Sequence, residues 1–156
     1  MRKRSKYRPK GVMINHVAYV LEGFAPIAKH TSQLLTLKLK AHAALTALLQ
    51  GTATAAHMGT IVDMYNMVEA LHKMGFGEEY ADCVEAGMAA VVEVVKRQHK
   101  IGKYVPTGPE IQALNRLIEL HDAQMDVVTV REVDRAIRLA KKEVVSGRAI
   151  NLRRPQ

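Results

Sequence analysis

The residues with the clearest chemistry are the cations at the two ends of the 156-residue chain. Residues 1–11 carry six basic side chains and residues 148–156 carry three, with no acid in either segment. Clustered Lys and Arg neutralise phosphates and release counterions, which gives affinity for nucleic acid without sequence preference. An aromatic side chain among them can stack on a base. The nucleic-acid contacts expected in these arms are Arg2, Lys3, Arg4, Lys6, Tyr7, Arg8, Lys10, Arg148, Arg153 and Arg154.

The distribution of charge favours this interpretation. The chain has a net charge of +8, yet all 15 acids lie between the arms, against 14 of the 23 basic residues. The part between the arms is therefore close to neutral, and the surplus charge belongs to the ends. Two alternatives are an arm that docks on an acidic protein surface and an arm that only aids solubility.

A second set of cations recurs every three to four residues in the segment 130–146. On a helix this spacing places most of them along one exposed side, which can follow a phosphate backbone beside the C-terminal arm. They are Arg131, Arg135, Arg138 and Lys142. Because three acids lie on the same helix, the alternative is an ordinary solvated surface.

Patterns for catalysis or metal binding are weak. None of the seven histidines is followed by another at four residues, and the His121-Asp122 pair lacks the further ligands of a metal phosphohydrolase motif. Cys83 is flanked by Asp82 and Glu85, which raise a thiol pKa, so we expect a core residue and not a nucleophile. We therefore expect a protein that is not an enzyme and has no cofactor or metal site.

Cysteine content and hydropathy favour the cytoplasm. A single cysteine cannot form an intramolecular disulfide and suits a reducing compartment. The most apolar stretch, residues 34–49, is too short and too charged to span a bilayer, so we expect no membrane partner. We also expect no signal peptide, because no uninterrupted apolar segment follows the basic N-terminus.

Helical spacing and helix caps dominate the rest of the chain. Thr107 to Glu110 and Thr129 to Glu132 are capping boxes, which mark helix starts, and glycines mark several ends. Residues 127–130 are β-prone, but the segment is short. We predict an all-α fold, a single bundle of five or six helices over residues 12–147 between flexible basic arms at 1–11 and 148–156. The expected helices cover residues 15–23, 32–50 (beginning at Pro26 or Ser32), 54–74, 78–101, 108–127 and 130–146.

The helix around residues 34–49 is apolar on nearly all sides. Such a helix is normally the buried centre of a bundle or an oligomer interface. We therefore expect a homo-oligomer, which would let two sets of arms act together.

The opening RKRSKYRPKG, the helical middle and the closing HDAQMDVVTVREVDRAI resemble small accessory proteins encoded by phages and prophages. Some proteins of that kind bind nucleic acid in replication, transcription control or packaging, whereas others disable host machinery, including defence complexes. The resemblance implies two hypotheses. The first is a non-enzymatic protein that binds DNA or RNA through its basic arms. The alternative is a protein-interaction module that docks on a host protein complex and inhibits or adapts it, through the apolar helix or the acidic middle of the chain.

Overall fold

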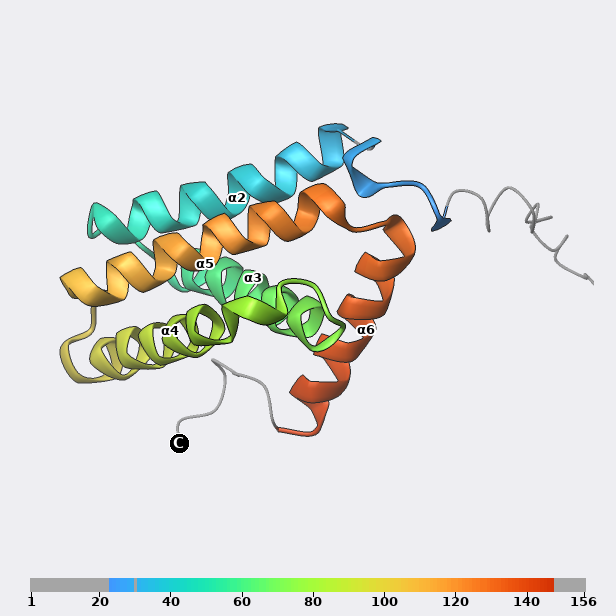
Figure 1. Ribbon diagram of the computed structural model, residues 1–156. Helices are drawn as coiled ribbons and strands as arrows, with labels where there is room; N and C mark the ends of the chain where they lie inside the picture. Colours follow the sequence, from blue (N-terminus) through green and yellow to red (C-terminus); the bar gives the residue numbers. More distant parts are fainter. Residues whose placement is uncertain (1–22, 30, 148–156) are drawn as a thin grey trace, which may run out of the picture.

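The computed structural model describes residues 23–29 and 31–147, and within these ranges it is helical with no strand (Figure 1). The all-α bundle predicted from the sequence is confirmed. The arms and the expected helix over residues 15–23 lie almost entirely outside the described residues. The elements are η1 (Ile27–Lys29), α2 (Thr31–Leu49), α3 (Ala55–Lys73), η2 (Glu78–Tyr80), α4 (Ala81–Ile101), α5 (Gly108–Val127) and α6 (Val130–Val145).

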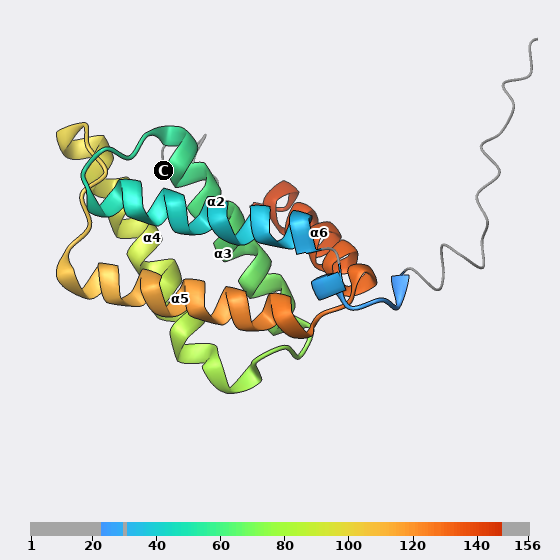
Figure 2. The same cartoon turned by 90° about the horizontal axis from the view of Figure 1, so that it is seen from above.

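Helix α3 is the centre of the bundle, because it packs against each of the other four α-helices. Helices α2 and α5 run side by side, and α6 crosses one end of the bundle (Figures 1 and 2). The main core lies among α2, α3, α4 and α5. A second core forms where α6 and η1 meet α3 and the end of α5. None of the helices in the described ranges has the length and apolar composition needed to cross a membrane.

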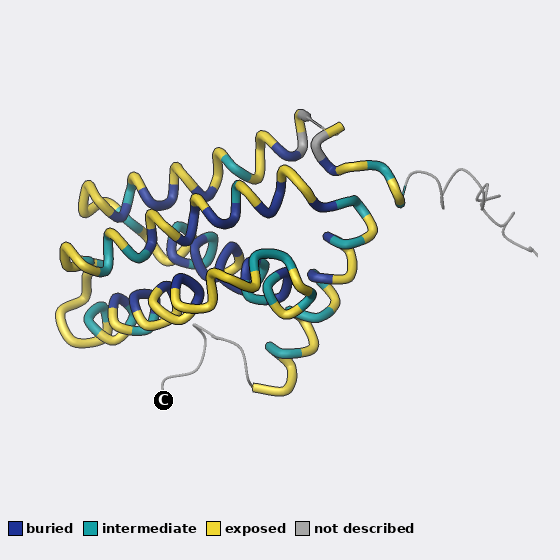
Figure 3. The backbone as a smooth tube through the Cα atoms, in the orientation of Figure 1, coloured by how far each residue is buried: buried dark blue, intermediate teal, exposed yellow. Residues whose placement is uncertain are grey.

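Of the two interpretations of the helix around residues 34–49, the buried centre of a bundle is wrong for the single chain, and the oligomer interface stays a prediction. Helix α2 buries one side against α3 and α5, and Figure 3 shows buried and exposed residues alternating along it. Four of its leucines remain exposed, because no described element covers them. They are Leu35, Leu37, Leu39 and Leu49. An all-round apolar pattern contains no information about which side meets the neighbours.

Local caps set the starts of α5 and α6 as predicted. The Thr107 N–H donates to Glu110 Oε2 at 2.7 Å, and the Thr129 N–H donates to Glu132 Oε2 at 2.7 Å. These bonds satisfy backbone donors that a helix start leaves without a partner. Both helices therefore begin at the residue after the capping threonine.

The first described residues are held against the start of α6. Pro26 and Thr129 form an isolated antiparallel bridge. The Ile27 N–H donates to Val128 O at 2.9 Å, and the Val130 N–H donates to Ala25 O at 3.1 Å. The β-prone segment between α5 and α6 is thus paired with residues 25–27, near the start of the described chain. This pairing places residues 23–26 beside the N-terminal end of α6.

Candidate nucleic-acid interface

Helix α6 presents the four internal basic residues that the sequence singled out. Val133 and Ala136 are buried in the second core, which turns the opposite side of the helix to solvent. All four predicted residues of this helix are exposed there, and together they are called the α6 stripe. The α6 stripe consists of Arg131, Arg135, Arg138 and Lys142.

Three members of the α6 stripe line an open groove. Arg131, Arg135 and Arg138 surround a space of about 400 Å³ together with Met74 and Leu139. Met74 comes from the end of α3, so the groove lies where α6 crosses the bundle. It combines guanidinium groups with an apolar lining, which suits a ligand that is both anionic and partly apolar.

Nearby acids offset part of the charge in this groove but leave Arg135 without an acidic partner among the described residues. The Glu132 carboxylate accepts hydrogen bonds from the Thr129 backbone and hydroxyl, so it serves as the helix cap. Asp134 pairs with Arg138, with 3.9 Å between Oδ2 and Nη2. Among the described residues, Arg135 forms no ion pair. Its guanidinium is thus available to a ligand anion.

An aromatic side chain that the sequence analysis did not single out lies against Arg131, one of the arginines that line the groove. The Arg131 guanidinium carbon lies 5.4 Å from the centroid of the Phe24 ring, a cation–π arrangement. Gly23 also packs close to Arg131 Cβ. The only sequence signal for this proximity is the β-prone segment before α6, which does not reveal its partner.

The predicted contacts in the arms, residues 2–10 and 148–154, lie outside the described residues. Their points of attachment are nevertheless defined. The chain that precedes Gly23 enters beside the N-terminal end of α6, and the chain that follows Gly147 leaves its C-terminal end. The described chain thus begins beside one end of the helix that carries the α6 stripe and ends just after the other.

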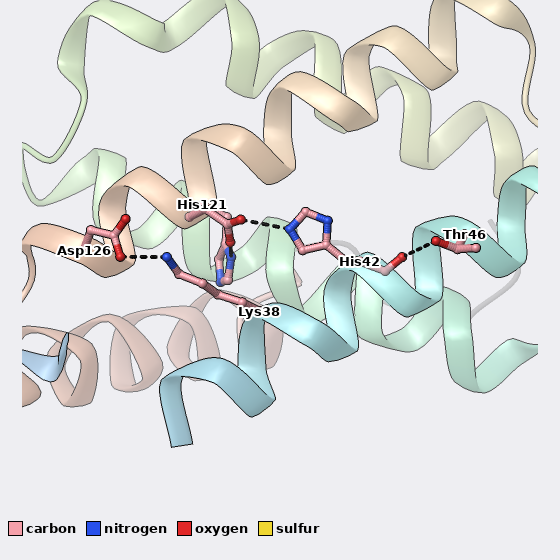
Figure 4. A network of polar contacts seen from close by, with 6 residues as sticks. Lys38, His42, Thr46, His121 and Asp126 are labelled. Carbon is pink, nitrogen blue, oxygen red and sulfur yellow. Dashed lines mark hydrogen bonds and ion pairs between the residues drawn. The ribbon is translucent and has the colours of Figure 1, made fainter. Parts of the chain in front are cut away.

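The His121-Asp122 pair belongs to a polar network between α2 and α5 (Figure 4). One Asp122 oxygen lies 3.4 Å from His121 Nδ1 and the other lies 2.8 Å from His42 Nε2. Lys38 Nζ donates to Asp126 Oδ1 at 2.6 Å. Burial lowers the pKa of His121, and the Asp122 carboxylate opposes that shift. The network fastens two helices together, and no three metal-ligating side chains gather among the described residues.

Cys83 is a core residue, as the sequence predicted. It is buried in the main core near the start of α4. Burial is the largest cause that raises the pKa of its thiol, and the neighbouring Asp82 carboxylate raises it further. A thiol of this kind stays protonated and is a poor nucleophile.

Comparison with protein-family models, curated proteins and solved structures gives no match for this chain. The candidate interface therefore rests on geometry and charge. It consists of the α6 stripe, the groove beside it and the two points from which the basic arms extend.

Proposed function

We propose that this protein is a non-enzymatic, phage-type accessory protein of the cytoplasm that binds DNA or RNA through the α6 stripe and its two basic arms. The observation that carries the proposal is the exposed α6 stripe, together with the position of Gly23 and Gly147, the first and last described residues, beside the two ends of α6. Under this proposal, three sets of cations that are far apart in the sequence contact one nucleic-acid ligand. Counterion release from many phosphate contacts then supplies the affinity.

The length of the N-terminal arm supports a shared interface. Twelve residues separate Lys10 from Gly23, and with the expected helix over residues 15–23 they allow a reach of at most about 30 Å. The α6 stripe covers eleven residue steps from Arg131 to Lys142, or about 16 Å along the helix axis. The arm can therefore contact phosphates well beyond those that the stripe can reach.

The test is fluorescence anisotropy with labelled duplex DNA, single-stranded DNA and RNA at several salt concentrations. A chain that lacks residues 2–10 should bind more weakly and with a shallower dependence on salt than the full chain. The variant Arg135→Gln/Lys142→Gln should reduce the slope of log K against log salt by up to about 2 on duplex DNA, because each neutralised phosphate accounts for about 0.9 of that slope.

A matched control removes two exposed cations from the far end of the bundle. Lys100→Gln/Lys103→Gln changes the net charge by the same amount, but these residues lie at and after the end of α4, away from α6 (Figure 1). The control should leave the slope nearly unchanged. Equal effects of the two variants would assign the binding to net charge alone. No binding by the full chain near physiological salt would overturn the proposal.

A second candidate function is the protein-interaction module that docks on a host protein complex and inhibits or adapts it. The observation that favours it is the outer side of α2, where Leu35 and Leu39 are 53% and 57% exposed. Residues four apart on a helix lie on the same side, so these leucines form one apolar strip. Under this hypothesis, binding to a protein partner survives deletion of residues 2–10 and is abolished in Leu35→Ser/Leu39→Ser.

The same leucines are the candidate surface for a homo-oligomer. Light scattering after gel filtration distinguishes the two roles of α2. A dimer that becomes a monomer in the leucine variant would support an oligomeric body with two sets of arms. A monomeric full chain would instead favour the apolar strip of α2 as a binding surface for a host protein.

A further inference from the structure

We infer that the groove beside α6 selects single-stranded nucleic acid and that the Phe24 ring is the platform on which one base stacks. This inference rests on the proposed function and specifies its substrate class. It starts from the Phe24 side chain, which is 59% exposed although it is one of only two phenylalanines in the chain. The other, Phe76, packs against the second core.

The backbone next to Phe24 is anchored to the start of α6. The next two residues are tied to the start of α6, by the hydrogen bond from Val130 to Ala25 and by the bridge between Pro26 and Thr129. The Arg131 guanidinium lies over the ring, whereas more than half of the side chain stays open to solvent. A ring held in this way loses little freedom when a planar group stacks on it.

The groove next to Phe24 offers what an unpaired nucleotide needs. Met74 and Leu139 provide an apolar lining for a base, and the arginines provide positive charge for its phosphate. Arg131 takes part in both features, because it lines the groove and lies over the Phe24 ring. Guanidinium planes and aromatic faces are the two surfaces on which unstacked bases pack in single-strand complexes.

Duplex DNA cannot use this platform. Its bases are stacked on one another, so their faces are closed to Phe24, and only the phosphates remain for the arginines. The duplex should therefore bind through charge alone. A single strand should bind through charge and stacking, and every base has a face that can stack. The groove should accordingly favour single strands with little sequence preference.

The first experiment places a reporter at the platform. The chain contains no tryptophan, so Phe24→Trp creates a single indole that is excited separately from the tyrosines. An unlabelled single-stranded oligonucleotide should quench its fluorescence by stacking. The same sequence as a duplex, and heparin, which has the charge without the bases, should bind with little quenching. Equal quenching by the duplex would overturn the inference.

The second experiment measures affinity by anisotropy. Phe24→Ala should weaken single-strand binding about tenfold and leave duplex binding unchanged, because a stacked base contributes that much when its aromatic partner is removed. Phe24→Tyr should retain the affinity. Tyr80→Ala is the matched control, because Tyr80 is also an exposed aromatic, 48% exposed, but its ring has no cation–π contact with an arginine of the groove. Thermal melting of each variant confirms that it is folded.

The outcomes separate this inference from the function on which it rests. If the full chain binds neither single strands nor duplex, the proposed function fails and the inference fails with it. If the full chain binds nucleic acid but prefers duplex, or binds single strands equally well as Phe24→Ala, only the inference fails. If polyglutamate displaces a bound single strand at an equal charge concentration, the groove binds an acidic polypeptide as well as it binds a nucleic acid. That result would favour an acidic protein as the partner, and the inference is again overturned.

Discussion

The close packing of Gly87 against Leu117 predicts opposite effects for two glycine substitutions. Gly87 of α4 is buried, and a Cβ atom added there would lie 2.9 Å from Leu117 Cδ1 and 3.0 Å from Leu117 Cδ2 on α5. Gly59 of α3 has no atom within 4 Å of such a Cβ. Both glycines lie inside helices, so the two substitutions share the same gain in helix propensity. They differ in whether the new methyl group meets another side chain.

The size of the effect follows from these two terms. Replacement of Gly by Ala inside a helix stabilises it by about 1 kcal/mol when the new methyl group has room. Overpacking a filled core costs about 1–3 kcal/mol. The Leu117 side chain is fully buried, so it cannot move into solvent to relieve the contact. Gly87→Ala should therefore be destabilised by up to about 2 kcal/mol, and Gly59→Ala stabilised by about 1 kcal/mol.

Urea unfolding followed by circular dichroism measures both variants. In a domain of this size each kcal/mol corresponds to roughly 2–4 °C in Tm, so thermal melting should rank them in the same order. In a Leu117→Ala background the atoms that oppose the new methyl group are absent, and Gly87→Ala should become favourable. If Gly87→Ala were as stable as Gly59→Ala with Leu117 present, the close packing of α4 on α5 would be wrong.

Two further predictions concern titratable groups. Burial is the largest cause that lowers the pKa of His121 below its ordinary value near 6.5. As the pH falls through that value the unfolded chain takes up a proton first, so stability should fall by up to about 1.4 kcal/mol per pH unit. Urea unfolding at pH 7.5 and 5.5 should show a smaller decrease for His121→Asn, and equal decreases would contradict the assignment. Arg97 holds the pKa of Glu110 below its usual range through two hydrogen bonds, of 2.8 and 2.9 Å. Arg97→Ala should raise that pKa. Arg97→Lys should raise it less, because a lysine keeps the positive charge although it cannot form both bonds at once. Carbon-13 NMR titration of the carboxyl group measures the shift, and an unchanged pKa in Arg97→Ala would refute it.

Helix boundaries could be predicted from the sequence because they depend on neighbours within one turn. The bonds from Thr107 to Glu110 and from Thr129 to Glu132 join residues three apart, so the residue types alone reveal them. Gly75 and Gly77 both adopt positive φ angles, 98° and 79°, at the corner that follows α3. Side chains favour other backbone angles there, so a glycine marks such a turn in any fold.

The packing of whole helices was less predictable. The pattern of α2 is more apolar than that of α3, yet α3 occupies the centre and α2 leaves leucines exposed. A helix is buried by the elements that surround it, and the number of its neighbours depends on the path of the entire chain. Composition sets how much apolar surface a helix has, but not how much of it other helices cover.

The candidate site divides in the same way. The sequence establishes the charge of the arms and the spacing of Arg131, Arg135 and Arg138, because charge and helical period are local properties. It contains no sign that Phe24 lies beside Arg131, since that contact requires the start of the described chain to pair with the link between α5 and α6. Contacts of this kind form when distant surfaces pack together. The residue types of the site were therefore visible in the sequence, and their assembly around one groove came from the packing of the bundle.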